Sequence, residues 1–185
     1  MNVIQTKLPG VLLIEPKIFG DERGYFFESW SEAKFREAGI SCSWIQDNES
    51  KSRFGVLRGL HYQAAPYTQA KLVRVIAGAV LDVAVDIRKN SPTYGQYVAV
   101  ELSGENKRQL FIPRGFAHGF AVLSDEVIFA YKCDNVYCPA SERGIAFDDP
   151  DLGIDWQVKP DKWILSPKDT GHPRFRDIAP WEETC

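Results

Sequence analysis

A series of short runs of alternating and β-branched residues, each bounded by Gly, Pro, Asn or Ser, limits what this chain can fold into. Such runs are typical of β-strands separated by turns. They cover residues 11–18, 24–30, 56–63, 71–76, 79–87, 97–102, 109–112, 119–123 and 127–133. Many short strands with turn residues between them predict a closed or sandwiched antiparallel sheet.

Helical signals are weak by comparison. One brief helix is predicted, with Ser31 as N-cap, Glu32 in its first turn and an end near Gly39. Neither a repeat nor a linker interrupts the chain, and 185 residues fit one core, so residues 1–185 are interpreted as a single domain. The stretch from Trp156 onward is rich in Pro, Lys and Asp and is expected to wrap the surface. We therefore expect an all-β jelly roll of the cupin type, a double-stranded β-helix with short peripheral helices.

Composition excludes several classes of function. The net charge of −3 and the pI near 5.7 provide no basic surface for nucleic acid. The apolar runs are short and interrupted by charge, so we expect neither a membrane span nor a signal peptide, and we expect a cytoplasmic protein. Four cysteines without CxxC spacing are expected to be reduced thiols, at Cys42, Cys133, Cys138 and Cys185.

The run 79–87 has two different faces. One face carries Leu81, Val83, Val85 and Ile87, and the other carries Asp82 and Asp86. Because charged side chains are seldom buried without partners, we expect the two aspartates to face water. The alternative is that they line a polar cavity, where Lys71 would be a suitable partner.

The run 58–63 (RGLHYQ) contains His61, one of only three histidines in the chain. A lone histidine on a strand is more often a satisfied core residue than a catalytic base, so spacing alone leaves both readings open. Strict alternation places Arg58 and His61 on opposite faces, so both reach one site only through a bulge, for which Gly59 is a plausible place. The histidines are far apart in sequence and form no HxH pair, so we predict no metal site.

Seven runs in register carry a family resemblance. They are residues 21–26 (DERGYF), 46–48 (QDN), 58–63 (RGLHYQ), 69–73 (QAKLV), 82–88 (DVAVDIR), 112–120 (IPRGFAHGF) and 165–169 (LSPKD). In order and spacing, from about residue 5 to residue 170, the chain resembles the dTDP-4-dehydrorhamnose 3,5-epimerase family. The resemblance implies a homodimeric cupin enzyme, without metal or cofactor, that inverts C3 and C5 of dTDP-4-keto-6-deoxy-D-glucose on the way to dTDP-L-rhamnose.

The resemblance also implies a role for each catalytic candidate. Inversion next to a ketone needs a base on one face, a group that stabilises the enolate, and an acid on the other face. His61 matches the base, Asp169 the carboxylate that orients it, and Tyr131 the acid. An imidazole mismatched to the carbon acid by about ten pKa units faces a cost of about 14 kcal/mol, so the enolate must be stabilised. Lys71 matches the family's position for that task.

Further residues match family positions that contact the nucleotide-sugar. Arg23 and Arg58 are fork-shaped donors suited to phosphate oxygens. The other matched positions are Glu28, Gln46, Asp47, Asn48, Lys71, His118, Glu142 and Lys168. Tyr137 is a candidate for stacking on thymine. In the family the N-terminal strand crosses to the neighbouring subunit, so Arg23 and Glu28 are expected to serve the neighbour's site.

Two other functions compete with this interpretation. A C3-only epimerase acting on a related dTDP-4-keto-6-deoxysugar would keep His61, Tyr131 and Lys71. A non-catalytic cupin that binds sugars would need no paired acid and base, and the presence of both argues against it.

Overall fold

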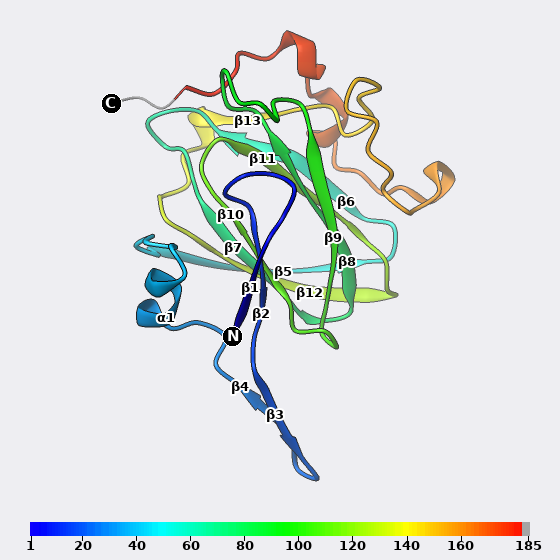
Figure 1. Cartoon of the computed structure of the whole chain (residues 1–185). Helices are drawn as coiled ribbons and strands as arrows, with labels where there is room; N and C mark the ends of the chain where they lie inside the picture. The colour runs from blue at the N-terminus through cyan, green and yellow to red at the C-terminus, as the bar shows by residue number, and fades with distance from the viewer. Residues whose placement is uncertain (183–185) are drawn as a thin grey trace.

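Two antiparallel β-sheets packed face to face form the body of the computed structural model, which describes residues 1–182 (Figure 1). The six-stranded sheet runs, in spatial order, β1 (Asn2–Gln5), β2 (Leu12–Glu15), β10 (Gln109–Ile112), β7 (Lys71–Ala77), β12 (Glu126–Cys133) and β5 (Gln46–Arg53). The five-stranded sheet runs β13 (Glu142–Gly144), β6 (Leu57–Gln63), β11 (Phe116–Val122), β8 (Ala79–Asp86) and β9 (Tyr97–Ser103). The expected cupin-type jelly roll is confirmed.

A third, two-stranded unit stands apart from the two sheets. It is the hairpin of β3 (Ile18–Asp21) and β4 (Gly24–Phe27), which projects away from the body of the chain (Figure 1). The hairpin exposes several large apolar side chains, and the side chain of Phe26 is the most exposed at 68%. Exposed apolar side chains gathered on one segment are typical of a surface that another molecule covers.

Each predicted run overlaps a strand of its own, but four strands within residues 1–182 were not predicted: β1, β3, β5 and β13. The most instructive of these is β5, whose sequence QDNESKSR contains no apolar residue. Its side chains nevertheless alternate between partly buried and exposed positions. The inward-facing residues of β5 are polar, and a pattern search based on hydrophobic alternation cannot detect such a strand.

The prediction that Asp82 and Asp86 face water is wrong, because both are 0% exposed. The outward face of β8 carries Leu81, Val83 and Val85, and it packs against the C-terminal segment instead of meeting solvent. The aspartates therefore point between the sheets, and the alternative of a polar interior is the correct one. Their hydrogen bonds are not to Lys71, the partner suggested under that alternative: Asp82 is bonded to His118 and Asp86 to Arg88.

A dense set of hydrogen bonds makes the burial of Asp86 possible. The guanidinium of Arg88 donates to both carboxylate oxygens, at 3.0 and 2.7 Å. The hydroxyls of Ser91 and Thr93 donate at 2.7 and 2.6 Å. Burial opposes ionisation of Asp86, but the hydrogen bonds from Arg88, Thr93 and Ser91 outweigh it and lower the pKa of this carboxyl. The charge is therefore stable inside the barrel.

The chain after Trp156 lies on the surface, as predicted, and there it covers the outer face of the five-stranded sheet (Figure 1). It contains the short helices η2 (Pro160–Lys162), η3 (Asp169–Gly171) and η4 (Phe175–Asp177). Its Trp163, Leu165, Phe175 and Trp181 pack against the apolar cluster of that face. No helix within residues 1–182 has the length and apolar character needed to cross a membrane.

The predicted helix is α1 (Glu32–Glu37), and it covers the outer face of the six-stranded sheet through Phe35. Ser31 occupies the N-cap position, although its side chain makes no capping bond. Cys42, Cys133 and Cys138 are free thiols, as expected, and Cys185 lies outside the described residues.

Strand β6 contains the bulge that the sequence required at Gly59. Opposite β6, His118 of β11 pairs with His61 and Phe120 pairs with Arg58, so three steps along β6 match two along β11. Gly59 has a φ of 136°, and a Cβ atom at this position would lie 2.5 Å from the Cα of Gly119. Only glycine fits such a close approach of two strands.

Substitution of Gly59 tests the importance of this contact. We expect Gly59→Ala to lower the free energy of unfolding by about 2–4 kcal/mol, because it adds a steric clash to an unfavourable φ. Gly24→Ala is the matched control, since Gly24 has a φ of 129° but open space around its Cβ position. Chemical denaturation followed by tryptophan fluorescence measures both. Equal losses would show that backbone conformation, and not the contact with Gly119, determines the effect.

Candidate active site

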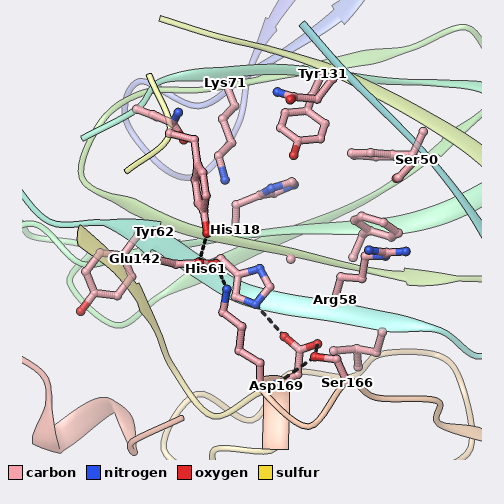
Figure 2. Close-up of a pocket in the computed structure, with 18 of the residues that line it drawn as sticks. Ser50, Arg58, His61, Tyr62, Lys71, His118, Tyr131, Glu142, Ser166 and Asp169 are labelled. Carbon is pink, nitrogen blue, oxygen red and sulfur yellow. Dashed lines mark hydrogen bonds and ion pairs between the residues drawn. The ribbon is translucent and has the colours of Figure 1, made fainter. Parts of the chain in front are cut away.

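A cavity of about 670 Å³ opens between the two sheets. Its walls come from β5, β7 and β12 of one sheet, from β6, β11 and β13 of the other, and from the segment 164–169. Figure 2 shows that side chains far apart in the sequence, among them Arg58, His61, Lys71 and Tyr131, converge on this space. Most of the site residues predicted from the sequence therefore line this one cavity.

A histidine and a carboxylate form the central pair of the site. The Nε2 atom of His61 lies 2.6 Å from Oδ1 of Asp169, which is only 4% exposed. The hydroxyl of Ser166 donates to Oδ2 of Asp169 at 2.6 Å. Burial opposes ionisation of Asp169, but the hydrogen bonds from His61 and Ser166 outweigh it and lower the pKa of Asp169 to about 2. Asp169 is therefore a carboxylate that accepts the Nε2–H of His61.

The tautomer of His61 follows from this hydrogen bond. A neutral imidazole carries one proton, and the carboxylate of Asp169 holds that proton on Nε2. The lone pair is then on Nδ1. His61 is 28% exposed and lines the cavity, so it has a free acceptor there.

A tyrosine and a lysine approach from the opposite sheet. Tyr131 of β12 and Lys71 of β7 both direct their polar ends into the cavity, across from His61 (Figure 2). Burial raises the pKa of Tyr131, so the phenol stays protonated and can donate a proton. Burial lowers the pKa of Lys71, while Cys133, Asp82 and Glu142 act in the opposite direction. The cavity thus has an acceptor on one wall and donors on the other.

A second histidine and carboxylate lie deeper between the sheets. Nε2 of His118 is 2.9 Å from Oδ2 of Asp82, and both residues are buried. Burial lowers the pKa of His118, and Lys71 acts in the same direction, although Asp82 opposes both. His118 is therefore a neutral donor or acceptor that lines the cavity.

Charged and polar side chains extend from this centre along the cavity. The guanidinium of Arg58 donates to the hydroxyl of Ser52 at 3.2 Å, and the amide of Gln46 donates to Asn48 at 2.9 Å. Glu142 accepts bonds from Lys168 and from the phenol of Tyr137. Burial opposes ionisation of Glu142, but these two hydrogen bonds outweigh it and lower its pKa. This extension provides cations and amides for a ligand larger than a single sugar.

Three of the predicted ligand contacts lie outside the cavity of this chain. Arg23 is at the tip of the projecting hairpin, where its side chain is 85% exposed and pairs with Asp21. Glu28 pairs with Lys34 at 2.8 Å. The carboxylate of Asp47 pairs with Lys132 on the other side of β5.

Sequence reasoning missed three residues around the site. Ser50 lines the cavity from β5, and Ser166 binds the carboxylate of Asp169. The position of Ser166 three residues before Asp169 was a usable signal, because a serine at that spacing often bonds the later residue. His172 lies beside His61, with ring centroids 5.4 Å apart, and nothing in its sequence context indicated this.

The tautomer of His61 provides a test of the central pair. In Asp169→Asn, the carboxamide can donate to Nε2, so we expect the proton of the neutral ring to move to Nδ1. Long-range proton–nitrogen NMR correlations of the imidazole measure this directly. Ser166→Ala retains the carboxylate and should retain the Nε2–H tautomer. An unchanged tautomer in Asp169→Asn would mean that another group orients the ring.

Comparison with known proteins places the chain in one family. Residues 5–177 match the sequence profile of the family described as dTDP-4-dehydrorhamnose 3,5-epimerase. A dTDP-4-dehydrorhamnose 3,5-epimerase of Shigella flexneri is 57% identical over 178 residues, which are 96% of this chain and 97% of that protein. One of Methanothermobacter thermautotrophicus is 54% identical over 175 residues, 94% of each chain.

Solved structures agree with the sequence matches. The crystal structure of the dTDP-6-deoxy-D-glucose-3,5-epimerase of Legionella pneumophila, in complex with dTDP-4-keto-L-rhamnose, superposes with a TM-score of 0.94. The two sequences are 52% identical, and the match covers 99% of both chains. Fold, profile and identity over nearly the full length lead to one conclusion: the chain belongs to the dTDP-4-dehydrorhamnose 3,5-epimerase family.

Proposed function

We propose that this protein converts dTDP-4-keto-6-deoxy-D-glucose into dTDP-4-keto-L-rhamnose, in dTDP-L-rhamnose biosynthesis, with His61 and Tyr131 as its two proton-transfer groups. One observation carries this assignment of roles. A histidine paired with a buried carboxylate and a protonated phenol lie on opposite walls of one cavity (Figure 2). Inversion of a carbon requires a proton acceptor on one of its faces and a proton donor on the other. A sugar bound between these walls would have His61 on one face and Tyr131 on the other.

The first step is removal of a proton from C3 or C5, the carbons next to the C4 ketone. Nδ1 of His61 accepts this proton, and the ring becomes an imidazolium. The carboxylate of Asp169, 2.6 Å from Nε2, stabilises the positive charge as it forms. The electron pair left on carbon moves into the enolate, so negative charge collects on the C4 oxygen.

Lys71 stabilises the negative charge on the C4 oxygen of the enolate. A mismatch of about ten pKa units between an imidazole and the carbon acid costs about 14 kcal/mol. A preorganised cation at the site of developing charge is the strongest means of reducing this cost. The half-buried ammonium of Lys71 lies in the same cavity, where screening by water is weaker than at the surface.

Return of a proton from the opposite face completes each inversion. The phenol of Tyr131 is protonated because burial raises its pKa, so it is available as the donor. The enolate takes this proton, and solvent then restores the phenol and removes the proton from His61. The polar extension with Arg58, Lys168 and Gln46 would hold the diphosphate and the base, which positions the reacting carbons.

The projecting hairpin supports a homodimer with shared active sites. Arg23 and Glu28 do not reach the cavity of their own chain, and the hairpin that carries Arg23 exposes Phe19, Tyr25 and Phe26. In a symmetric dimer, exchange of hairpins would bury these apolar side chains and bring Arg23 to the neighbouring cavity. The dimer then explains why Arg23 and Glu28, which match ligand-contact positions of the family, lie outside the cavity of their own chain.

Isotope exchange tests the chemistry. Incubation in heavy water with dTDP-4-keto-6-deoxy-D-glucose should introduce deuterium at C3 and C5, as read by mass spectrometry and NMR. His61→Ala should slow exchange by about 10²–10⁴-fold, the typical contribution of a general base. Tyr131→Phe should retain more exchange than inversion, because proton removal does not need the phenol. Chelating agents should leave the rate of exchange undiminished.

The outcomes of this experiment separate the competing functions. Absence of exchange at both carbons would rule out the epimerase, and exchange at C3 alone would identify a C3-only epimerase. Equal loss of exchange and inversion in Tyr131→Phe would remove Tyr131 from its role. dTDP binding by each variant, measured by calorimetry, is the control for folding.

Complementation between inactive variants tests the shared site. Arg23→Ala and His61→Ala homodimers should each have low activity. After subunit exchange, half of the dimers are mixed and each mixed dimer has one intact site, so we expect about a quarter of wild-type activity. No recovery in a mixture shown to contain mixed dimers would mean that Arg23 does not serve the partner's site.

A further inference from the structure

His172 has no role in the proposed reaction, yet it lies directly beside the catalytic pair. Its ring meets that of His61 edge-on, with centroids 5.4 Å apart and an interplanar angle of 76°. Its side chain is 11% exposed. Nε2 of His172 is buried and has no hydrogen-bond partner within residues 1–182. Because buried polar atoms nearly always have a partner, this nitrogen requires a physical explanation.

Three possible metal donors converge at this point. One donor atom each from His61, Asp169 and His172 all lie within 4.8 Å of one another. Oδ1 of Asp169 is 2.6 Å from Nε2 of His61 and 3.9 Å from Nε2 of His172. Zinc with ligands at about 2.0–2.1 Å in a tetrahedron needs donors about 3.3 Å apart, a value between these two distances. Two imidazoles and one carboxylate are also a ligand set of zinc enzymes.

The surrounding backbone holds the three donors in place. Asp169 and His172 are three residues apart, at the start and the C-cap of η3. Gly144 of β13 pairs with His61, and a Cβ atom at Gly144 would lie 2.4 Å from Cε1 of His172. The imidazole of His172 thus occupies space that only a glycine leaves open, between β13 and the ring of His61.

We propose that His61, Asp169 and His172 form an inhibitory zinc site, in which a bound zinc ion disables His61 as the base of the reaction. The inference rests on the function proposed above for its effect on catalysis. Zinc takes Nε2 of His61, Oδ1 of Asp169 and Nε2 of His172 as ligands and retains water as the fourth. The orphaned nitrogen of His172 then has a partner.

The inhibition follows from the tautomer of His61. Zinc binds a nitrogen lone pair, so the Nε2–H bond of His61 must break as the Nε2–Zn bond forms. The proton moves through solvent to Nδ1, and the ring remains neutral. Nδ1–H then faces the cavity, where the active enzyme needs a lone pair. A zinc-loaded site therefore binds the sugar but cannot remove its proton.

The position of the metal predicts a kinetic signature. Zinc would lie on the Nε2 side of His61, between this ring and His172, which does not line the cavity that receives the dTDP-sugar. We expect zinc to lower kcat and to leave KM unchanged. Zinc chelated by the diphosphate of free substrate would instead raise the apparent KM. Magnesium prefers oxygen ligands and should not inhibit at the same concentration.

His172→Gln is the decisive variant, because it removes one ligand and retains both His61 and Asp169. We expect the zinc concentration for half-inhibition to rise by at least about tenfold in this variant, relative to its own activity without metal. Cys133→Ser is the matched control, since the free thiol of Cys133 lines the cavity and belongs to a class of side chain that binds zinc, but lies outside the proposed site. It should retain wild-type sensitivity to zinc.

Direct binding is measured without substrate. Equilibrium dialysis should show one zinc ion per wild-type chain, and cobalt should produce the visible absorption of a tetrahedral site. Both signals should be lost in His172→Gln, with circular dichroism confirming its fold. A protein that binds zinc in this way but shows no deuterium exchange into the dTDP-sugar would retain the metal site and lose only the proposed epimerase function.

Several results would overturn the zinc site. They are equal inhibition of wild type and His172→Gln, inhibition expressed only as a rise in KM, loss of sensitivity in Cys133→Ser, and no zinc retained on dialysis. Each of these would leave the unpartnered nitrogen of His172 as a cost to stability and nothing more.

Discussion

The carboxylate of Asp169 is the point on which fold and site both depend. It is almost fully buried, and two of its partners come from the distant strand β6: His61 and the backbone N–H of Gly59, at 3.4 Å. The third, Ser166, lies three residues earlier in the same segment. A buried carboxylate without such partners would be protonated or would destabilise the fold. The same hydrogen bonds therefore attach the C-terminal segment to the five-stranded sheet and determine which nitrogen of His61 carries the proton.

Buried acidic side chains with hydrogen-bond partners recur in the interior of this jelly roll. Asp86 is bonded by Arg88 and two hydroxyls, and Asp82 is bonded by His118. Loss of one member of such a pair leaves the other buried and unpaired, which is costly. Polar groups between the sheets thus restrict the ways in which the sheets can pack. They also line the cavity, which is the part of the interior that apolar side chains do not fill.

The single chain forms most of the cavity, while the hairpin points away from it. Under the proposed dimer, the exposed apolar side chains of β3 and β4 and the distant position of Arg23 have one common cause, which is that their partners lie on another subunit. The proposed zinc site depends on packing within the chain. Gly144 leaves room for the ring of His172, and the close approach of three donors follows from that space.

Hydrophobic alternation in the sequence determined most of the strands and the jelly roll, because apolar residues on a strand must face a core. The motif spacing identified the family, and the mismatch between Arg58 and His61 located the bulge at Gly59. Tertiary structure alone decided which face of β8 is inside, because the C-terminal segment covers the apolar face and lets the aspartates point inward. It also revealed β5, whose inward side chains are polar because they line a cavity. The position of His172 beside His61 depends on contacts between β6, β13 and η3, which lie far apart in sequence, so no local pattern could encode it.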